Sequence, residues 1–150
     1  MFWERWENYN LKNFVLFYQK SGRCISTIAI KVGHLIEDKH RDKLIDLSLS
    51  SLQGKTFPGK EDLLKGLAKL SSRSCESLKR KPEKCQAIVE AILRECGKSE
   101  PTYKRHGLEA LGEVLEAFDN IDYFQRVYDI IHALLNQVRK ESEREGEREG

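Results

Sequence analysis

Histidines and cysteines are the residues of this 150-residue sequence that could most directly support a metal site or a nucleophile. A zinc site needs such residues in close pairs or at helical spacing, and the sequence pairs none of them in that way. The histidines are His34, His40, His106 and His132, and the cysteines are Cys24, Cys75, Cys85 and Cys96. Because the sequence also shows no secretory signal, we expect reduced thiols and structural histidines, and no bound metal.

The acidic residues and the glycine-rich turn also lack the partners that catalysis would require. Glu109, Glu113 and Glu116 share one face of a predicted helix, with no acid–base partner nearby in the sequence. The turn at residues 54–60 follows no predicted strand, and Lys60 precedes an acid where a phosphate-binding loop needs Ser or Thr. We therefore expect no enzyme activity and no cofactor.

Charge and hydropathy exclude further classes of partner. Lys plus Arg (26) nearly balance Asp plus Glu (24), which gives a net charge of +2. The basic clusters at residues 79–81 and 104–106 are short and have acids around them, so we expect no nucleic-acid partner. No apolar run approaches the roughly 20 residues that span a bilayer, so we expect no transmembrane segment.

Residues 54–65, with the sequence GKTFPGKEDLLK, are typical of a turn that becomes a helix. Gly54 permits the positive φ that ends a preceding helix, and Pro58 has the fixed φ that suits a first helical turn. Glu61 and Asp62 follow where acidic side chains favour the positive end of the helix dipole. We expect a new amphipathic helix to begin at about residue 58.

Apolar residues recur at three- and four-residue spacing along most of the chain, which predicts a succession of amphipathic helices. We expect these helices near residues 22–37, 40–53, 58–78, 82–97, 101–118 and 121–139. Gly97 is the expected left-handed cap of the fourth of them. Residues 140–150 are almost entirely charged, so we expect a disordered tail or a frayed helix end there.

The first twenty residues hold both tryptophans and most of the aromatic residues of the chain. These residues are Phe2, Trp3, Trp6, Tyr9, Phe14, Phe17 and Tyr18. We expect a separate N-terminal helix over residues 1–20 that packs its aromatic side chains on a neighbouring helix. A helix that lies on a membrane surface is the alternative, although the segment lacks the basic face of such helices.

A longer regularity groups the helices in pairs. The apolar pair Leu44-Ile45 recurs as Ile88-Val89 and as Ile130-Ile131, at offsets of 44 and 42 residues. In the partner helices an offset of 44 residues relates Lys60, Leu64, Leu67 and Leu70 to Lys104, Leu108, Leu111 and Val114. A period of about 40–47 residues made of two helices is typical of HEAT and armadillo arrays. The sequence thus predicts an all-α solenoid over residues 21–139. A plain bundle of helices of similar length is the alternative.

Two strings also resemble a known family of proteins. Residues 54–65 are similar to the pattern G-[KR]-T-[WF]-x-G-K-E-[ED]-L-L-K, and residues 87–104 look like I-L-x-A-[VI]-L-[KR]-E-C-[SG]-K-[ES]-x-x-x-Y-K. Both patterns are found in the proteasome adapter and scaffold family, whose members are long solenoids of HEAT repeats. The similarity runs from about residue 22 to residue 138 and corresponds to a short piece near the C-terminal end of those proteins.

The resemblance implies a non-catalytic adaptor or scaffold that binds subunits of the 26S proteasome in the cytoplasm and nucleus. It further implies a role in tethering the core particle to the regulatory particle. The alternative is a generic HEAT interaction module, such as a transport or assembly factor, that has no proteasome partner. Because a short piece of solenoid exposes the apolar faces of its end repeats, we also expect self-association.

Helix order suggests where a protein partner would bind. In a HEAT array the second helices of successive hairpins line one surface, so charges on the helices that begin near residues 58 and 101 would form one ridge. Such a ridge of mixed charge suits recognition by electrostatic complementarity. The residues that we assign to it are Lys60, Glu61, Lys65, Lys104, Arg105, Glu109 and Glu113.

Overall fold

A computed structural model describes the backbone of residues 2–149 and the side chains of residues 16, 17 and 19–149. The helices are α1 (Phe2–Val32), α2 (Asp38–Ser51), α3 (Lys60–Arg73), α4 (Cys75–Leu78), α5 (Pro82–Cys96), α6 (Pro101–Phe118) and α7 (Ile121–Glu149), with a 3-10 turn η1 (Gly33–Leu35) after α1. Within the described part of the chain there is no β-strand, which confirms the predicted all-α class.

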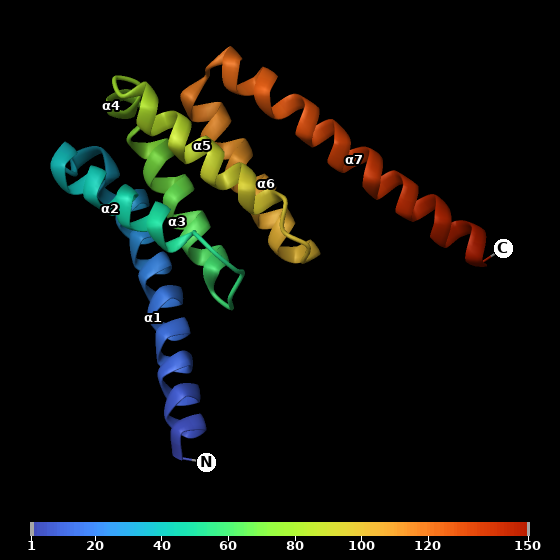
Figure 1. Cartoon of the computed structure of the whole chain (residues 1–150). Coiled ribbons are helices and arrows are strands. Elements are labelled where there is room, and N and C mark those ends of the chain that lie inside the picture. Colours follow the sequence, from blue (N-terminus) through green and yellow to red (C-terminus); the bar gives the residue numbers. More distant parts are fainter. Residues whose placement is uncertain (1, 150) are drawn as a thin grey trace. The chain divides into compact units, whose positions relative to one another are not determined.

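Helix α3 lies at the centre of the compact unit that spans Met1–Phe118. It packs against α1 on one side and α6 on the other, as Figure 1 shows. Helix α2 also packs on α3, and α5 packs on α6, so the α2–α3 and α5–α6 hairpins stack through α3 and α6. This arrangement is the solenoid stacking that the repeat of 44 residues predicts. Residues Asp119–Gly150 form a second unit, to which α7 belongs.

The core of the first unit comes from the apolar stripes that the sequence predicts. Leu64 and Leu67 of α3 are fully buried, and Leu111 and Val114 of α6 are no more than 2% exposed. Burying one such side chain stabilises the fold by about 1.5–3 kcal/mol relative to leaving it in water. The stripes of α3 and α6 therefore hold neighbouring repeats together.

The turn before α3 differs in detail from the prediction. Gly54 has the expected positive φ of 87°, and Gly59, also with a positive φ of 91°, is the N-cap residue of the helix. The helix begins at Lys60, so Pro58 lies in the turn and not in the first helical turn. Glu61 and Asp62 occupy the first turn of α3 as predicted, where the helix dipole favours acids.

Helix α1 continues through the position where we predicted a break near residues 21 and 22. A Cβ atom added to Gly22 would lie 2.5 Å from the backbone carbonyl carbon of Asp62, so α1 and α3 approach closely there. On α3, a Cβ atom added to Gly66 would lie 2.9 Å from the carbonyl oxygen of Gly22. Gly22 therefore lies where α1 and α3 cross, and not at the helix start that we predicted from the sequence.

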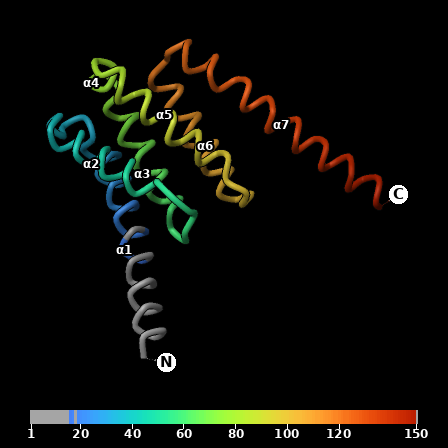
Figure 2. The backbone as a smooth tube through the Cα atoms, in the orientation of Figure 1, coloured from blue at the N-terminus to red at the C-terminus, as the bar shows by residue number. Residues whose placement is uncertain are grey.

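Two other helix ends also differ from the prediction. The helix expected over residues 58–78 is divided at Ser74 into α3 and the short α4, a path that can be followed in Figure 2. Gly97 follows α5 with a φ of −83°, so it is not a left-handed cap. Asn120 caps the start of α7, because its side-chain Oδ1 accepts a hydrogen bond of 2.9 Å from the Asp122 amide.

The two ends of the chain bear on two further expectations. Helix α7 continues through residues 140–149, where we expected a disordered tail or a frayed helix end. Arg139 and Glu143 form an ion pair one helical turn apart, 3.6 Å from Nε to Oε1, which favours the helix there. At the other end, the expected packing of aromatic side chains concerns residues 2–14 and 18, which lie outside the described side chains. Phe17 is described and is 64% exposed.

Candidate protein-binding surface

Six of the seven predicted binding residues lie on two helices that pack together, α3 and α6. We call their surface the α3–α6 face, and its residues are Glu61, Lys65, Lys104, Arg105, Glu109 and Glu113. Lys65, Arg105 and Glu109 are exposed. The other three residues are half-buried. An ion pair from Lys69 Nζ to Glu113 Oε1, 2.9 Å long, joins the two helices across this face. The two helices that we expected to carry the ridge are therefore neighbours in the structure.

Lys60, the seventh predicted residue, does not lie on this face. Its side chain is fully buried, and its Nζ atom lies 2.7 Å from Oε1 of Glu95, which is itself 2% exposed. The ammonium group also donates hydrogen bonds to the carbonyl oxygens of Gly54, at 3.1 Å, and Lys55, at 3.4 Å. Its assignment to a binding surface is therefore corrected, because a buried and paired charge cannot reach a partner.

The buried Lys60–Glu95 pair joins two repeats. Glu95 lies at the end of α5, and Lys60 begins α3, so the pair ties the turn before α3 to the neighbouring hairpin. Lys98 strengthens the tie, because its Nζ donates a 3.0 Å hydrogen bond to the Gly54 carbonyl. Such a pair contributes little net stability compared with apolar residues, but a charge left without its partner is costly.

The burial of this ion pair could have been predicted from the positions of the two residues, although their charge suggests the surface. Lys60 stands four residues before Leu64 and seven before Leu67, so it shares their inward stripe. Glu95 likewise stands three residues after Ile92 on the inward stripe of α5. Two opposite charges on two buried stripes are the pattern that could have predicted an internal ion pair.

The remaining charges of the face make weaker, local contacts. Arg105 Nε lies 3.9 Å from Oε1 of Glu109, and His106 Nδ1 lies 3.6 Å from Oε2 of the same residue. Asp62 faces the other way, because its Oδ2 lies 3.6 Å from Nε of Arg23 on α1. Lys65 and Arg105 therefore present exposed positive charge on two helices that pack together, with Glu109 beside Arg105.

The cysteines are all free thiols, and two of them are buried. Burial raises the pKa of Cys96 to about 12, with a smaller contribution from the charge of Glu95. Burial likewise raises the pKa of Cys85, whose Sγ donates to the Leu78 carbonyl at 3.0 Å. Both thiols stay protonated at neutral pH, which is the state of a packing residue and not of a nucleophile.

Among the described side chains, no group of three or more His, Cys, Asp or Glu residues is placed to hold a metal ion. The described helices also include none that is long and apolar enough to cross a membrane.

Comparison with known proteins shows the family of the chain. The model of the family described as ECM29, C-terminal ARM-like repeats, matches residues 71–149, which is more than half of the chain. The chain belongs to the ECM29 family. This assignment agrees with the family that the two sequence strings resemble and with the stacked hairpins of the structure.

Two curated ECM29 proteins are similar to the chain over most of its length. The proteasome-associated protein ECM29 homolog of Drosophila melanogaster is 39% identical over 130 residues, which are 85% of this chain and 7% of that protein. The proteasome adapter and scaffold protein ECM29 of Homo sapiens is 32% identical over 122 residues, which are 79% of this chain and 6% of that protein. The chain thus spans a small part of these ECM29 relatives. No solved structure matches it.

Proposed function

We propose that the chain is a non-catalytic adaptor segment that binds the 26S proteasome through the α3–α6 face. The observation that carries this proposal is membership of the ECM29 family, whose two similar relatives are named as proteasome-associated or as a proteasome adapter and scaffold. The α3–α6 face supports it, because its exposed charges stand on two helices held together by a buried core.

The tethering role and the cellular location that we propose come from the family resemblance. We infer that the segment contributes to tethering the core particle of the proteasome to its regulatory particle, in the cytoplasm and nucleus. A rigid stack of hairpins suits this role, since it presents a fixed charge pattern without an ordering cost on binding. The proteasome contact would then be weakened by salt, because its charged groups are exposed.

Capture of partners from a cell lysate tests the proposal. A tagged wild-type chain should enrich proteasome subunits, and the double charge reversal Lys65→Glu and Arg105→Glu should reduce that enrichment about tenfold or more. The matched control reverses Lys43 and Arg94, which are exposed on α2 and α5 and lie outside the α3–α6 face. This control should bind like the wild type. Lys60 is not a suitable target, since its reversal would disrupt the core.

Two outcomes would contradict the proposal. Equal loss of binding in both double variants would show that the α3–α6 face has no special role. Enrichment of other proteins without any proteasome subunit would leave the generic HEAT interaction module as the function of the chain.

A further inference from the structure

Apolar side chains form a stripe along the first part of α7, and most of this stripe is open to water. We call it the α7 stripe, and its residues are Ile121, Phe124, Tyr128, Ile131, Leu135 and Val138. All except the half-buried Ile131 are exposed. Their spacings alternate between three and four residues, which is the seven-residue repeat of a coiled coil. The stripe therefore has the spacing that packs against another helix.

A hollow of about 470 Å³ lies on the α7 stripe, within the second unit. Its lining residues are Ile121, Phe124, Gln125, Tyr128 and Asp129. The first four of them stand three, four and seven residues after Ile121, and all belong to one helix. In a coiled coil, four residues so placed surround one side chain that the facing helix inserts. The hollow thus has the form of a hole for a side chain from a second helix.

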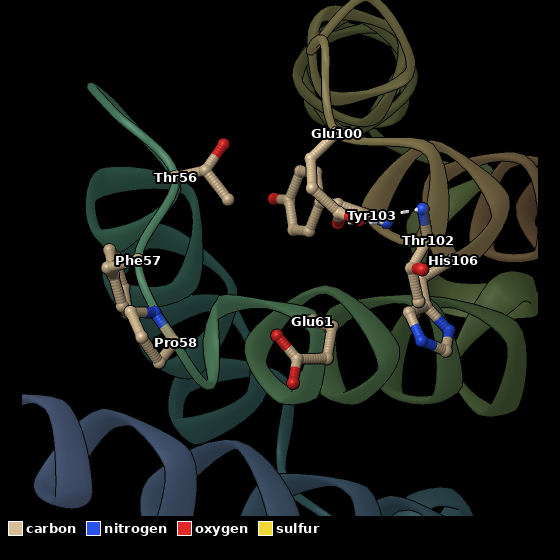
Figure 3. A pocket seen from close by; sticks show the side chains of 8 residues that line it. All are labelled: Thr56, Phe57, Pro58, Glu61, Glu100, Thr102, Tyr103 and His106. Atoms are coloured by element: carbon tan, nitrogen blue, oxygen red, sulfur yellow. Dashed lines mark hydrogen bonds between the residues drawn. The ribbon is translucent and has the colours of Figure 1, made fainter.

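A different hollow, which Figure 3 shows from close by, lies between the turn before α3 and the start of α6. Its Glu100 carboxylate accepts hydrogen bonds from the amides of Thr102, at 3.0 Å, and Tyr103, at 2.7 Å. The Tyr103 hydroxyl donates a hydrogen bond to the buried carboxylate of Glu95. These polar groups are bonded within the chain, whereas the α7 stripe remains exposed to water.

A second copy of α7 matches the stripe when the two helices run antiparallel. The spacings along the stripe are 3, 4, 3, 4 and 3 residues, which read the same in both directions. One alignment therefore sets Ile121 of each copy opposite Val138 of the other. The same alignment sets Phe124 opposite Leu135, and Tyr128 opposite Ile131. Leu135 of one copy then lies level with the hollow of the other.

The charges at the two ends of the stripe favour this antiparallel orientation. Asp119 and Asp122 are exposed at its start, and Arg139 and Lys140 are exposed just after its end. Antiparallel pairing brings the acidic end of one copy beside the basic end of the other, whereas parallel pairing would bring like charges together. Arg139 also lies 3.6 Å from Glu143 in its own helix, but such an exposed pair is weak and can exchange partners.

We propose that the α7 stripe is a self-association site, which binds the α7 stripe of a second copy of this chain as an antiparallel pair. Leu135 of each copy enters the hollow of the other, and the charged ends lie side by side. Because the two copies use the same surface, the pair closes as a dimer with two-fold symmetry. The inference does not depend on the proteasome role, since the stripe shares no residue with the α3–α6 face.

Sedimentation velocity of the full chain over a range of concentrations tests the site. The wild type should show a reversible equilibrium of monomer and dimer. Leu135→Glu should raise the dimer Kd about tenfold or more, because pairing would then bury a carboxylate. The matched control Ala133→Glu adds the same charge at an exposed position of α7 outside the stripe, and should keep the Kd within about twofold. Both variants should retain the circular dichroism spectrum of the wild type.

Disulfide formation between two differently tagged chains tests the orientation. Cys24→Ser and Cys75→Ser first remove the two thiols that are not buried. One chain then carries Ile121→Cys and the other Val138→Cys, and mild oxidation should join the two different chains. Ala133→Cys chains, used as the control, should form far less dimer. Disulfides that join only like chains would overturn the antiparallel pairing.

Three further results would overturn the proposal. They are a wild-type chain that stays monomeric at every concentration, a dimer that Leu135→Glu leaves intact, and equal weakening by Leu135→Glu and Ala133→Glu. Binding of another protein to the stripe of a monomeric chain would assign the surface to that protein instead.

The proteasome role has a separate readout. A wild-type chain that dimerises but captures no proteasome would retain the self-association site and contradict the proteasome role alone. A monomeric wild-type chain that captures the proteasome would do the reverse.

Discussion

Helices α3 and α7 carry the same kind of apolar stripe, yet their side chains have different environments. In α3, Leu63, Leu64 and Leu67 are at most 3% exposed. In α7, Ile121 is 76% exposed and Leu135 is 65% exposed. Periodicity therefore defines which face of a helix is apolar, whereas burial depends on a neighbouring helix that covers it. In a solenoid each helix gains most of its stability from such neighbours.

The largest expected effect concerns the buried charge at the start of α3. Lys60→Met should lower the free energy of unfolding by about 3–5 kcal/mol, because it leaves Glu95 buried with only the more distant Lys98, 3.7 Å away, as a counter-charge. Lys65→Met, an exposed change on the same helix, should stay within about 0.5 kcal/mol of the wild type. Urea denaturation of the two variants provides the measurement. Adding Glu95→Leu to Lys60→Met should recover much of the loss, and no recovery would contradict the ion-pair explanation.

The comparison of α3 with α7 can be tested by one substitution in each helix. Leu67→Ala should cost about 2–5 kcal/mol of unfolding free energy, because it opens a cavity in the core. Leu135→Ala should change it by about 0.5 kcal/mol or less. Chemical denaturation followed by circular dichroism measures both values. Equal costs would show that α7 is packed as closely as α3.

The exposed stripe of α7 also predicts self-association, for which sedimentation velocity is the measurement. The wild-type chain should form larger species as its concentration rises, since contiguous exposed apolar side chains favour association. Leu135→Ala should shift this equilibrium toward the monomer, and Leu67→Ala, in its folded state, should not. A single monomer peak at all concentrations would contradict this expectation.

A smaller effect is expected where α1 crosses α3. Gly22→Ala should destabilise the chain by about 1–3 kcal/mol, because the added Cβ atom would lie 2.5 Å from the backbone of α3. Gly112→Ala is the matched control, since a Cβ atom there meets nothing within 4 Å in the middle of α6. It should stabilise the chain by up to about 1 kcal/mol through helix propensity. In thermal unfolding, the midpoint of Gly22→Ala should fall below that of the wild type and the midpoint of Gly112→Ala should rise above it. Changes of the same sign would contradict the close crossing of α1 and α3.

The smallest predicted effect is the pH dependence that comes from Asp42 of α2. Burial raises the pKa of its carboxyl group, but the ion pairs with Lys81 and Lys84 outweigh burial, so the net pKa is lowered. A lowered pKa contributes stability that is present above the unfolded value near 3.8 and is lost as the pH falls through the folded value. Asp42→Asn should therefore cost about 0.2–1 kcal/mol at neutral pH and flatten the loss of stability below about pH 4. If the free energy of unfolding fell equally steeply with falling pH in the wild type and in Asp42→Asn, the result would count against the ion pairs of Asp42 with Lys81 and Lys84.

The helices and their stacking could be predicted from the sequence because both depend on repeated apolar spacing. The continuous α1 could not, since Ser21 and Gly22 also fit a helix start and only the approach of α3 explains the glycine. The site prediction erred at Lys60 for a related reason. A charged residue is expected at the surface of a protein. Because its partner Glu95 is far away in the sequence, the burial of the Lys60–Glu95 ion pair is seen only in the structure.

Binding to purified 26S proteasomes tests the central claim of a proteasome adaptor most directly. In co-sedimentation at moderate salt, the wild-type chain should travel with the proteasome, and the Lys43→Glu, Arg94→Glu control should do the same. The Lys65→Glu, Arg105→Glu variant should remain with the free protein while its circular dichroism spectrum is unchanged. A wild-type chain that stays in the free fraction at every proteasome concentration would contradict the account.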